Sequence, residues 1–307
     1  MTSTFDQIDT KLINLNSNDA SQNNGTYLSD VNFNFANILK EERDVTHTTI
    51  SVLNAQIPVA FYTVNSYNNL LNMNYNGTTQ LITITSGNYN GNTLITELQA
   101  RFTQYSFAIT VTLTRSSGIL TFSGTVPFTF YLTGSTSMQI LGFNALIAST
   151  GNAITLPFPM NLVGVKRLRI GSSNLTCTTF DSNTGSTLPF LCSIPVDVQS
   201  WGMISYLNTT KYELLLKENF INQVNITITD EYGNLVNFHN TNWTICLQLN
   251  IYRNKTRNGL TFEDALGNVA KEIHQLDADI RTSNIPIEAP QVDDENLGDL
   301  DLLSYNN

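Results

Sequence analysis

Apolar and polar residues alternate along several stretches of the chain, which is the periodicity of a β-strand with one buried face. In residues 106–114, SFAITVTLT, every second residue from Phe107 is apolar. Shorter runs at 126–132 and 224–228 repeat the pattern. In residues 243–252, WTICLQLNIY, one face carries Trp243, Ile245, Leu247, Leu249 and Ile251, and the other carries Thr244, Cys246, Gln248, Asn250 and Tyr252. With Gly-containing turn signals between the runs, this pattern predicts antiparallel sheets with one wet face, and therefore a mainly β sandwich.

Two segments interrupt the alternation and have the spacing of helices. Residues 91–102 place Leu94, Leu98 and Phe102 four residues apart, with Asn92 or Thr93 as the expected N-cap. Residues 135–142 predict a short helix that Ser135 or Thr136 opens and Gly142 stops. Because strands lie between the two helices, we interpret residues 78–150 as a small α+β module inserted in a discontinuous sandwich of residues 1–77 and 151–258.

A third helix is predicted in the C-terminal region, residues 259–307. From Phe262, the apolar residues step by 4, 3, 4, 3 and 4, which is heptad spacing, through Leu266, Val269, Ile273, Leu276 and Ile280. Such a helix packs against another subunit or another chain, or it folds back onto its own sandwich, and the sequence leaves these alternatives open. The residues that follow contain Pro, acids and few apolar residues, which predicts an extended or disordered acidic arm.

Charge is scarce and unevenly distributed along the 307 residues. Charged residues make up 13% of the chain, about half the fraction usual for a soluble domain, and 39 Asn and 39 Thr take their place. The formal charge is −10, of which −9 lies after residue 260, so the body is almost neutral. A neutral hydrogen-bonding surface is easier to desolvate against a copy of itself than a charged one, although an AT-rich genome also favours Asn codons.

The nearly neutral body argues against direct binding to nucleic acid, which needs several cations in register. The clusters Lys166, Arg167, Arg169 and Arg253, Lys255, Arg257 are interpreted as solvated strand ends or subunit contacts. We also expect no membrane span and no secretory signal, because no apolar run approaches the length of a span and the start MTSTFDQIDT has no apolar region. The three cysteines, Cys177, Cys192 and Cys246, have no CxxC pairing, which suits a reducing compartment.

We expect no catalytic, cofactor or metal site, and therefore no enzyme. A nucleophilic Cys192 with His239 as its base is the best arrangement available, but both residues occur in strand-like sequence where structural roles are commoner. A calcium site at Asp230, Glu231 and Asn234 lacks the six to eight oxygens of a tight site. There is no phosphate-binding loop and no GxSxG motif.

The chain contains a series of motifs in a defined order. Residues 50–64, ISVLNAQIPVAFYTV, form an apolar strand with an Ile-Pro step and an aromatic pair, and they resemble a segment near the front of the penton and minor capsid proteins of virophages and polinton-like viruses. The run ITITSGNYNGNTLITEL is similar to their Gly-Asn-Tyr turn before a helix, and MQILGF to the triplet that closes their inserted module. LCSIPVDVQSWGMISYL and VNITITDEYGNLVNFHNTNWTICLQL resemble their final strands. The resemblance covers about Leu28 to Arg253, and its specificity lies in the order and spacing of the motifs.

The resemblance implies a single jelly roll that forms homopentamers at the five-fold vertices of an icosahedral capsid, surrounded by double jelly-roll major capsid proteins. It implies a structural protein of the virion, assembled in the host cytoplasm or nucleus. We expect the inserted module to project outward from the ring. The alternatives are a minor capsid or cement protein that bridges major capsomers, and a jelly-roll module that binds a glycan or a host receptor. For the last alternative, the candidate platform residues are Trp201, Tyr206 and Tyr212.

Overall fold

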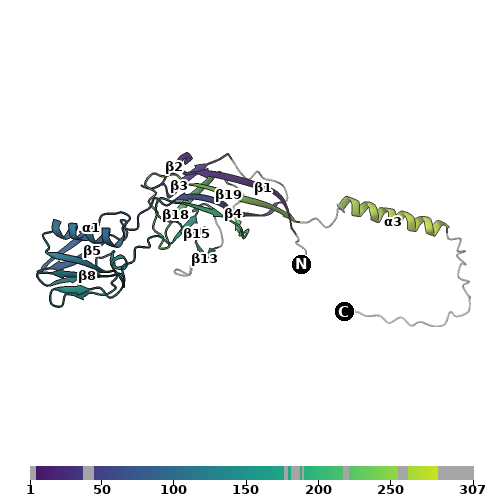
Figure 1. Cartoon of the computed structure of the whole chain (residues 1–307). Coiled ribbons are helices and arrows are strands. Elements are labelled where there is room, and N and C mark those ends of the chain that lie inside the picture. The colour runs from purple at the N-terminus through teal and green to yellow at the C-terminus, as the bar shows by residue number, and fades with distance from the viewer. Residues whose placement is uncertain are drawn as a thin grey trace, which may run out of the picture. The chain divides into compact units, whose positions relative to one another are not determined.

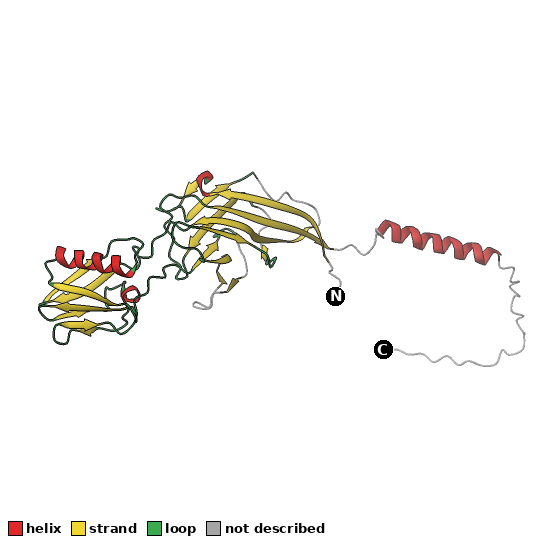
Figure 2. Ribbon diagram, in the orientation of Figure 1, coloured by secondary structure: helices red, strands yellow, loops and turns green. Residues whose placement is uncertain are grey.

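The computed structural model describes residues 5–36, 45–175, 179–180, 187–188, 190–216, 221–254 and 262–282. Strands dominate it, and the chain divides into two compact units, Met1–Asn254 and Lys255–Asn307 (Figure 1, Figure 2). Cys177, Lys255 and Arg257 lie outside the described residues. No helix of the described part is long and apolar enough to cross a membrane.

Eight main strands of the first unit form two antiparallel sheets with jelly-roll topology. The first sheet has the order β1 (Phe5–Asn16), β19 (Thr244–Asn254), β4 (Val45–Pro58), β16 (Met203–Leu207), and β17 (Leu214–Leu216) also pairs with β4. The second has the order β15 (Phe190–Pro195), β12 (Arg167–Gly171), β18 (Gln223–Thr229), β3 (Asp30–Asn34), β2 (Gln22–Asn23). Counting the main strands along the chain and leaving out β2 and β17, the orders are 1-8-3-6 and 5-4-7-2. This is a jelly roll, so the predicted fold class is confirmed.

The core of the jelly roll lies between the two sheets. All five residues expected on the inner face of β19 and its approach, from Trp243 to Ile251, are buried, as are Val224, Ile226 and Ile228 of β18. The indole Nε1 of Trp243 donates a hydrogen bond to the carbonyl oxygen of Leu28 at 2.7 Å, and its ring meets Phe33 edge-on with centroids 6.2 Å apart. The alternation in the sequence therefore identified the buried face correctly.

A second hydrophobic core is built from the middle of the chain. One of its sheets has the order β10 (Ile147–Ala148), β9 (Phe128–Phe130), β5 (Leu70–Tyr75), β6 (Thr78–Thr83), and the other has the order β11 (Ala153–Thr155), β8 (Ile119–Gly124), β7 (Ile109–Thr114). This core draws on residues from Val64 to Leu156, a wider range than the expected 78–150. The reason is that β5 pairs with both β6 and β9, so its buried residues Leu71 and Met73 belong here. That the two cores are separate domains stays a prediction.

The remaining elements are short, apart from two helices. They are η1 (Ser17–Asp19), α1 (Gly91–Gln104), α2 (Met138–Leu141), the paired strands β13 (Thr179–Phe180) and β14 (Thr187–Leu188), and α3 (Phe262–Thr282) in the second unit. Leu94, Leu98 and Phe102 of α1 are fully buried, as the spacing predicted. The expected N-caps were wrong by two or more positions in α1 and by one or more in α2: Asn90 caps α1 in a reciprocal capping box with Thr93, and Ser137 precedes α2.

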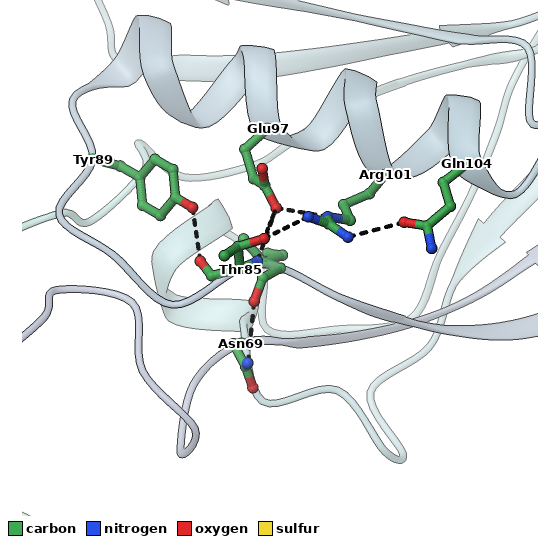
Figure 3. A network of polar contacts seen from close by, with 7 residues as sticks. Asn69, Thr85, Tyr89, Glu97, Arg101 and Gln104 are labelled. Carbon is green, nitrogen blue, oxygen red and sulfur yellow. Dashed lines mark hydrogen bonds and ion pairs between the residues drawn. The ribbon is translucent and has the colours of Figure 1, made fainter. Parts of the chain in front are cut away.

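A polar network fixes α1 to the loop that follows β6 (Figure 3). One carboxylate oxygen of Glu97 accepts hydrogen bonds from the Thr85 amide at 2.9 Å, the Thr85 hydroxyl at 2.5 Å and the Arg101 Nε at 2.7 Å. The other nitrogens of Arg101 donate to Thr85 Oγ1 and to Gln104 Oε1. Burial raises the pKa of Glu97, but the hydrogen bonds from Thr85 and Arg101 outweigh it, so the pKa lies below its ordinary value of 4.5.

The network makes stability depend on pH in acid. Because the pKa of Glu97 is lowered by folding, the unfolded chain takes up this proton first as the pH falls. The contribution of the carboxylate is therefore complete above about pH 4.5 and is lost as the pH falls through the lower pKa of the folded state. We expect the melting temperature of the wild type to fall more between pH 6 and pH 3 than that of Glu97→Gln, measured by circular dichroism. Parallel curves for the two proteins would contradict this account of the network.

Gly142 ends α2 in a conformation that other residues adopt only with strain. Its φ is +97°, and a Cβ added there would lie 2.2 Å from the carbonyl oxygen of Phe158. Gly77, with φ +83°, has no atom within 4 Å of an added Cβ. We expect Gly142→Ala to lower the free energy of unfolding by about 3 kcal/mol or more, and Gly77→Ala by only about 1 kcal/mol. Chemical denaturation measures both, and equal losses would show that the contact with Phe158 has no effect.

Candidate functional site

The residues proposed for nucleophilic catalysis do not form a site. Cys192 lies in β15, almost fully buried, and burial raises the pKa of its thiol to about 12. His239 lies in a turn, with Nδ1 2.8 Å from the carbonyl oxygen of Ala60 and its ring 4.1 Å from that of Tyr62. No hydrogen bond joins Cys192 to His239 in the described part of the chain. A thiol that stays protonated at neutral pH is a packing group, not a nucleophile.

The carboxylate of Asp230 accepts hydrogen bonds from groups of its own turn. Asp230 Oδ1 accepts hydrogen bonds from the amides of Tyr232 at 2.9 Å and Asn234 at 2.8 Å, while Oδ2 accepts one from Asn234 Nδ2 at 2.9 Å. The carboxylate of Glu231 lies 3.2 Å from the amide nitrogen of Lys166. Within the residues that the structure describes, no cluster of three or more His, Cys, Asp or Glu side chains could hold a metal ion. The carboxylate of Asp230 therefore stabilises the turn between β18 and the approach to β19.

The described arginines of the two basic clusters lie on strands, and Lys166 comes directly before β12. Arg167 and Arg169 alternate along β12 with Leu168 and Ile170, which are fully buried. Their guanidinium groups therefore belong to the face of the second sheet that points away from the core. Arg253 lies near the end of β19. Both positions fit the interpretation of strand residues more closely than that of a phosphate-binding stripe.

An exposed row of apolar side chains follows the last strand of the first sheet. β16 ends this sheet, and among the described strands it pairs with β4 alone. β17 also pairs with β4, further along that strand. Leu207 of β16 therefore lies opposite Asn54, and Leu215 of β17 lies opposite Thr49. The exposed large apolar side chains of this segment are Trp201, Met203, Leu207, Tyr212 and Leu215, which we call the β16–β17 edge.

The β16–β17 edge has the composition of a protein interface. Aromatic residues and Met are enriched at the centres of interfaces, where charged residues are depleted. Residues 201–216 contain two charged residues, Lys211 and Glu213. An unpaired sheet edge with exposed apolar side chains is also a place where a second chain readily docks. Two of the three aromatic residues suggested by the sequence belong to this edge, whereas Tyr206 is half-buried and packs on the core.

Next to this edge, the outer face of the first sheet carries a hydrogen-bonded network around the carboxylate of Glu213. Asn250, buried at 1% exposure, donates from Nδ2 to Glu213 Oε1 at 2.6 Å and accepts from Gln248 Nε2 at 2.9 Å. Glu213 Oε2 also accepts hydrogen bonds from the hydroxyls of Thr49 and Tyr252. Burial, and then the charge of Glu213, raise the pKa of Tyr252. The sequence predicted a wet face here, and this expectation was wrong at Asn250 and at Cys246, because neighbouring groups cover both side chains.

Trp201 holds an unusual backbone conformation at one end of the edge. Its φ is +71°, its side chain is 73% exposed, and its amide donates a hydrogen bond to the carbonyl oxygen of Val59 at 2.8 Å. A positive φ is rare for a bulky residue and costs free energy. An exposed tryptophan gains little burial within its own chain, so the strain is not offset locally. Strain of this kind is typical of sites with a function outside the folded monomer.

The strain at Trp201 predicts a reversal of the usual order of two substitutions. Glycine normally destabilises a folded chain relative to alanine, but at φ +71° only glycine avoids the steric cost. We expect Trp201→Gly to be more stable than Trp201→Ala by about 1 kcal/mol. Urea denaturation of both variants measures the difference, and a more stable Trp201→Ala would mean that the backbone at this position is not strained.

Comparisons with known proteins give one kind of match. No protein-family model matches the chain, and neither does any curated protein. Among solved structures, the chain is similar to the mavirus penton protein, known from the crystal structure of its selenomethionine-labelled form. The two share 12% sequence identity with a TM-score of 0.39, and the match covers 80% of this chain and 100% of that one.

Proposed function

We propose that the chain is a structural protein of a virion, and that it forms the homopentamer at the five-fold vertices of an icosahedral capsid. The observation that carries the proposal is the β16–β17 edge on a jelly roll, an apolar and strained sheet margin with few charges. The order of sequence motifs between Leu28 and Arg253 supports the same role. The proposal gives this chain the role that the mavirus protein is named for, with double jelly-roll major capsid proteins as neighbours.

A five-fold ring places specific demands on the surface of its subunit. Rings close only through heterologous contacts, in which one flank of a subunit meets a different flank of the next. The first sheet ends in two different margins, the β16–β17 edge and the strand β1, where Leu12 is exposed. We infer that the β16–β17 edge of one copy faces the β1 side of its neighbour.

The composition of the edge favours a protein partner over a sugar. Trp201 and Tyr212 suit a glycan platform as well as a protein interface. Met203, Leu207 and Leu215, however, have no hydrogen-bonding group for sugar hydroxyls, and they are exposed beside the two aromatic residues. A cement protein that bridges major capsomers has no need of five-fold self-assembly, so the oligomeric state separates it from a penton.

The test is the mass of the purified protein and of two matched variants. Leu207 and Leu146 are similarly exposed, at 61% and 56%, but only Leu207 belongs to the β16–β17 edge. We expect the wild type and Leu146→Asp to sediment at five times 34.1 kDa, and Leu207→Asp to sediment as a monomer, because a buried unpaired carboxylate opposes docking. Circular dichroism checks that both variants are folded. A monomeric wild type, or a pentamer that tolerates Leu207→Asp, would refute the proposed interface.

A further inference from the structure

Helix α3 exposes an apolar stripe along its length. Every described side chain of the helix is exposed, although four of them are large and apolar. Leu266, Val269, Ile273 and Leu276 are 53%, 54%, 62% and 60% exposed, and we call them the α3 stripe. Their spacing of three and four residues keeps them on one side of the helix. A stripe of this kind is the side of a helix that is buried when the helix docks on a partner.

Charge is segregated around the α3 stripe. With Leu266 and Ile273 at heptad position a, Val269 and Leu276 occupy position d. Positions e and g border the stripe, and in the described part of the helix they hold Ala270, Glu272 and Asp277. The flanking sequence positions 263 and 279 are acidic as well, whereas the bases at 271 and 281 fall at positions f and b, away from the stripe. Every charged residue at positions e and g along the stripe is therefore acidic.

This charge pattern disfavours a second copy of the same helix as the partner. In a parallel pair of α3 helices, Glu272 at position g would face Asp277 at position e of the other helix, and like charges at these positions repel. An antiparallel pair would again bring acidic borders together. Residues 261–307 carry a formal charge of −9, which adds to the repulsion between copies. A groove with Lys or Arg along its rim attracts the same borders.

The helix is also composed so that docking strengthens it. Gly267 and Asn268 lie within its second turn and lower its intrinsic stability. In proteins, burial of an amphipathic face supplies most of the stability of a helix. The α3 stripe is the face whose burial would do this. Association through α3 would therefore order the helix and exclude water from the stripe in a single step.

We propose that α3 is a docking helix, which binds in a groove of a protein other than this chain. The floor of that groove is apolar and meets the α3 stripe, and its rim is basic and meets Glu272 and Asp277. The inference rests on α3 alone and does not require that the jelly roll forms a pentamer. It commits to a basic protein partner, and it excludes both self-association through α3 and a partner selected by apolar contact without charge.

The test uses the full chain and two synthetic peptide probes. Both probes are helical peptides of about 28 residues with the same Leu and Ile stripe, one with Lys and one with Glu at every e and g position. We expect the full chain to bind the Lys peptide at least about tenfold more tightly than the Glu peptide, measured by fluorescence anisotropy, and to lose this preference in high salt. Equal binding of the two peptides, or binding of neither, would overturn the proposal.

Matched variants show whether the stripe and its borders are the binding surface. Ile273→Asp and Gln275→Asp add the same charge, but only the first interrupts the α3 stripe, so only the first should abolish binding.

A second comparison tests the acidic borders of the stripe. The double variant Glu272→Gln, Asp277→Asn changes the net charge as much as the double variant His274→Lys, Gln275→Lys does, when His274 is taken as neutral. We expect the first pair to reduce the preference for the Lys peptide about tenfold and the second to leave it in place. Equal effects within either comparison would mean that the acidic region attracts the peptide without a defined surface, which contradicts a docking helix.

Sedimentation of the same variants excludes the second copy. If Ile273→Asp, but not Gln275→Asp, reduces the mass of the full chain, then α3 binds its own copy and the proposal is wrong. If the mass is the same for both, α3 does not join copies of this chain, as the proposal requires. A failure of the pentamer gives a different result, because the wild type and both variants would then be monomeric.

Discussion

The pairing of β19 with β1 on one side and β4 on the other is the contact on which the jelly roll depends. β19 is the last strand of the first unit and β1 the first, so this contact brings together residues separated by almost the whole of the fold, with Leu15 opposite Ile245 and Ile13 opposite Leu247. The loop closed in this way is long, and its entropic cost is repaid by the apolar face of β19. Trp243 and four aliphatic residues of that face are fully or almost fully buried. This pairing sets the strand order of the first sheet, so that its margins are β1 on one side and β16 with β17 on the other.

The same strand separates an apolar interior from an outer face that carries hydrogen bonds. Leu249 and Ile251 point inward, and between them Asn250 joins the outer network centred on Glu213. At the margin of this sheet the pattern changes, and Met203, Leu207 and Leu215 stand exposed. A sheet that satisfies its polar groups internally and leaves its apolar groups outward has little to gain from water and much to gain from a protein partner. In this account, the interface between subunits forms at the sheet margin, where apolar side chains stay exposed in the monomer.

Sequence patterns predicted what depends on local periodicity. The inner faces of β18 and β19, the buried face of α1 and the end of α2 at Gly142 were all identified from spacing or from one glycine. The pairing of β5 with β9 was not, because it joins residues more than 50 positions apart and leaves no periodic signal. The burial of Asn250 was missed for a related reason, since Glu213 and the β1 residues Gln7 and Thr10, which hydrogen-bond to it, are distant in the sequence. Trp201 and Tyr212 were singled out as aromatic residues, but only the tertiary structure places them at a sheet margin, and nothing in the sequence indicates a positive φ at Trp201.

The central claim is that the β16–β17 edge is an interface between identical subunits. Cryo-electron microscopy of the assembled full-length chain tests it most directly, because it shows both the symmetry and the contacts. The account predicts a closed five-fold ring in which Trp201 and Leu207 of each copy are buried against a different flank of its neighbour. A particle of another symmetry, or a ring in which Trp201 and Leu207 face solvent, would contradict it.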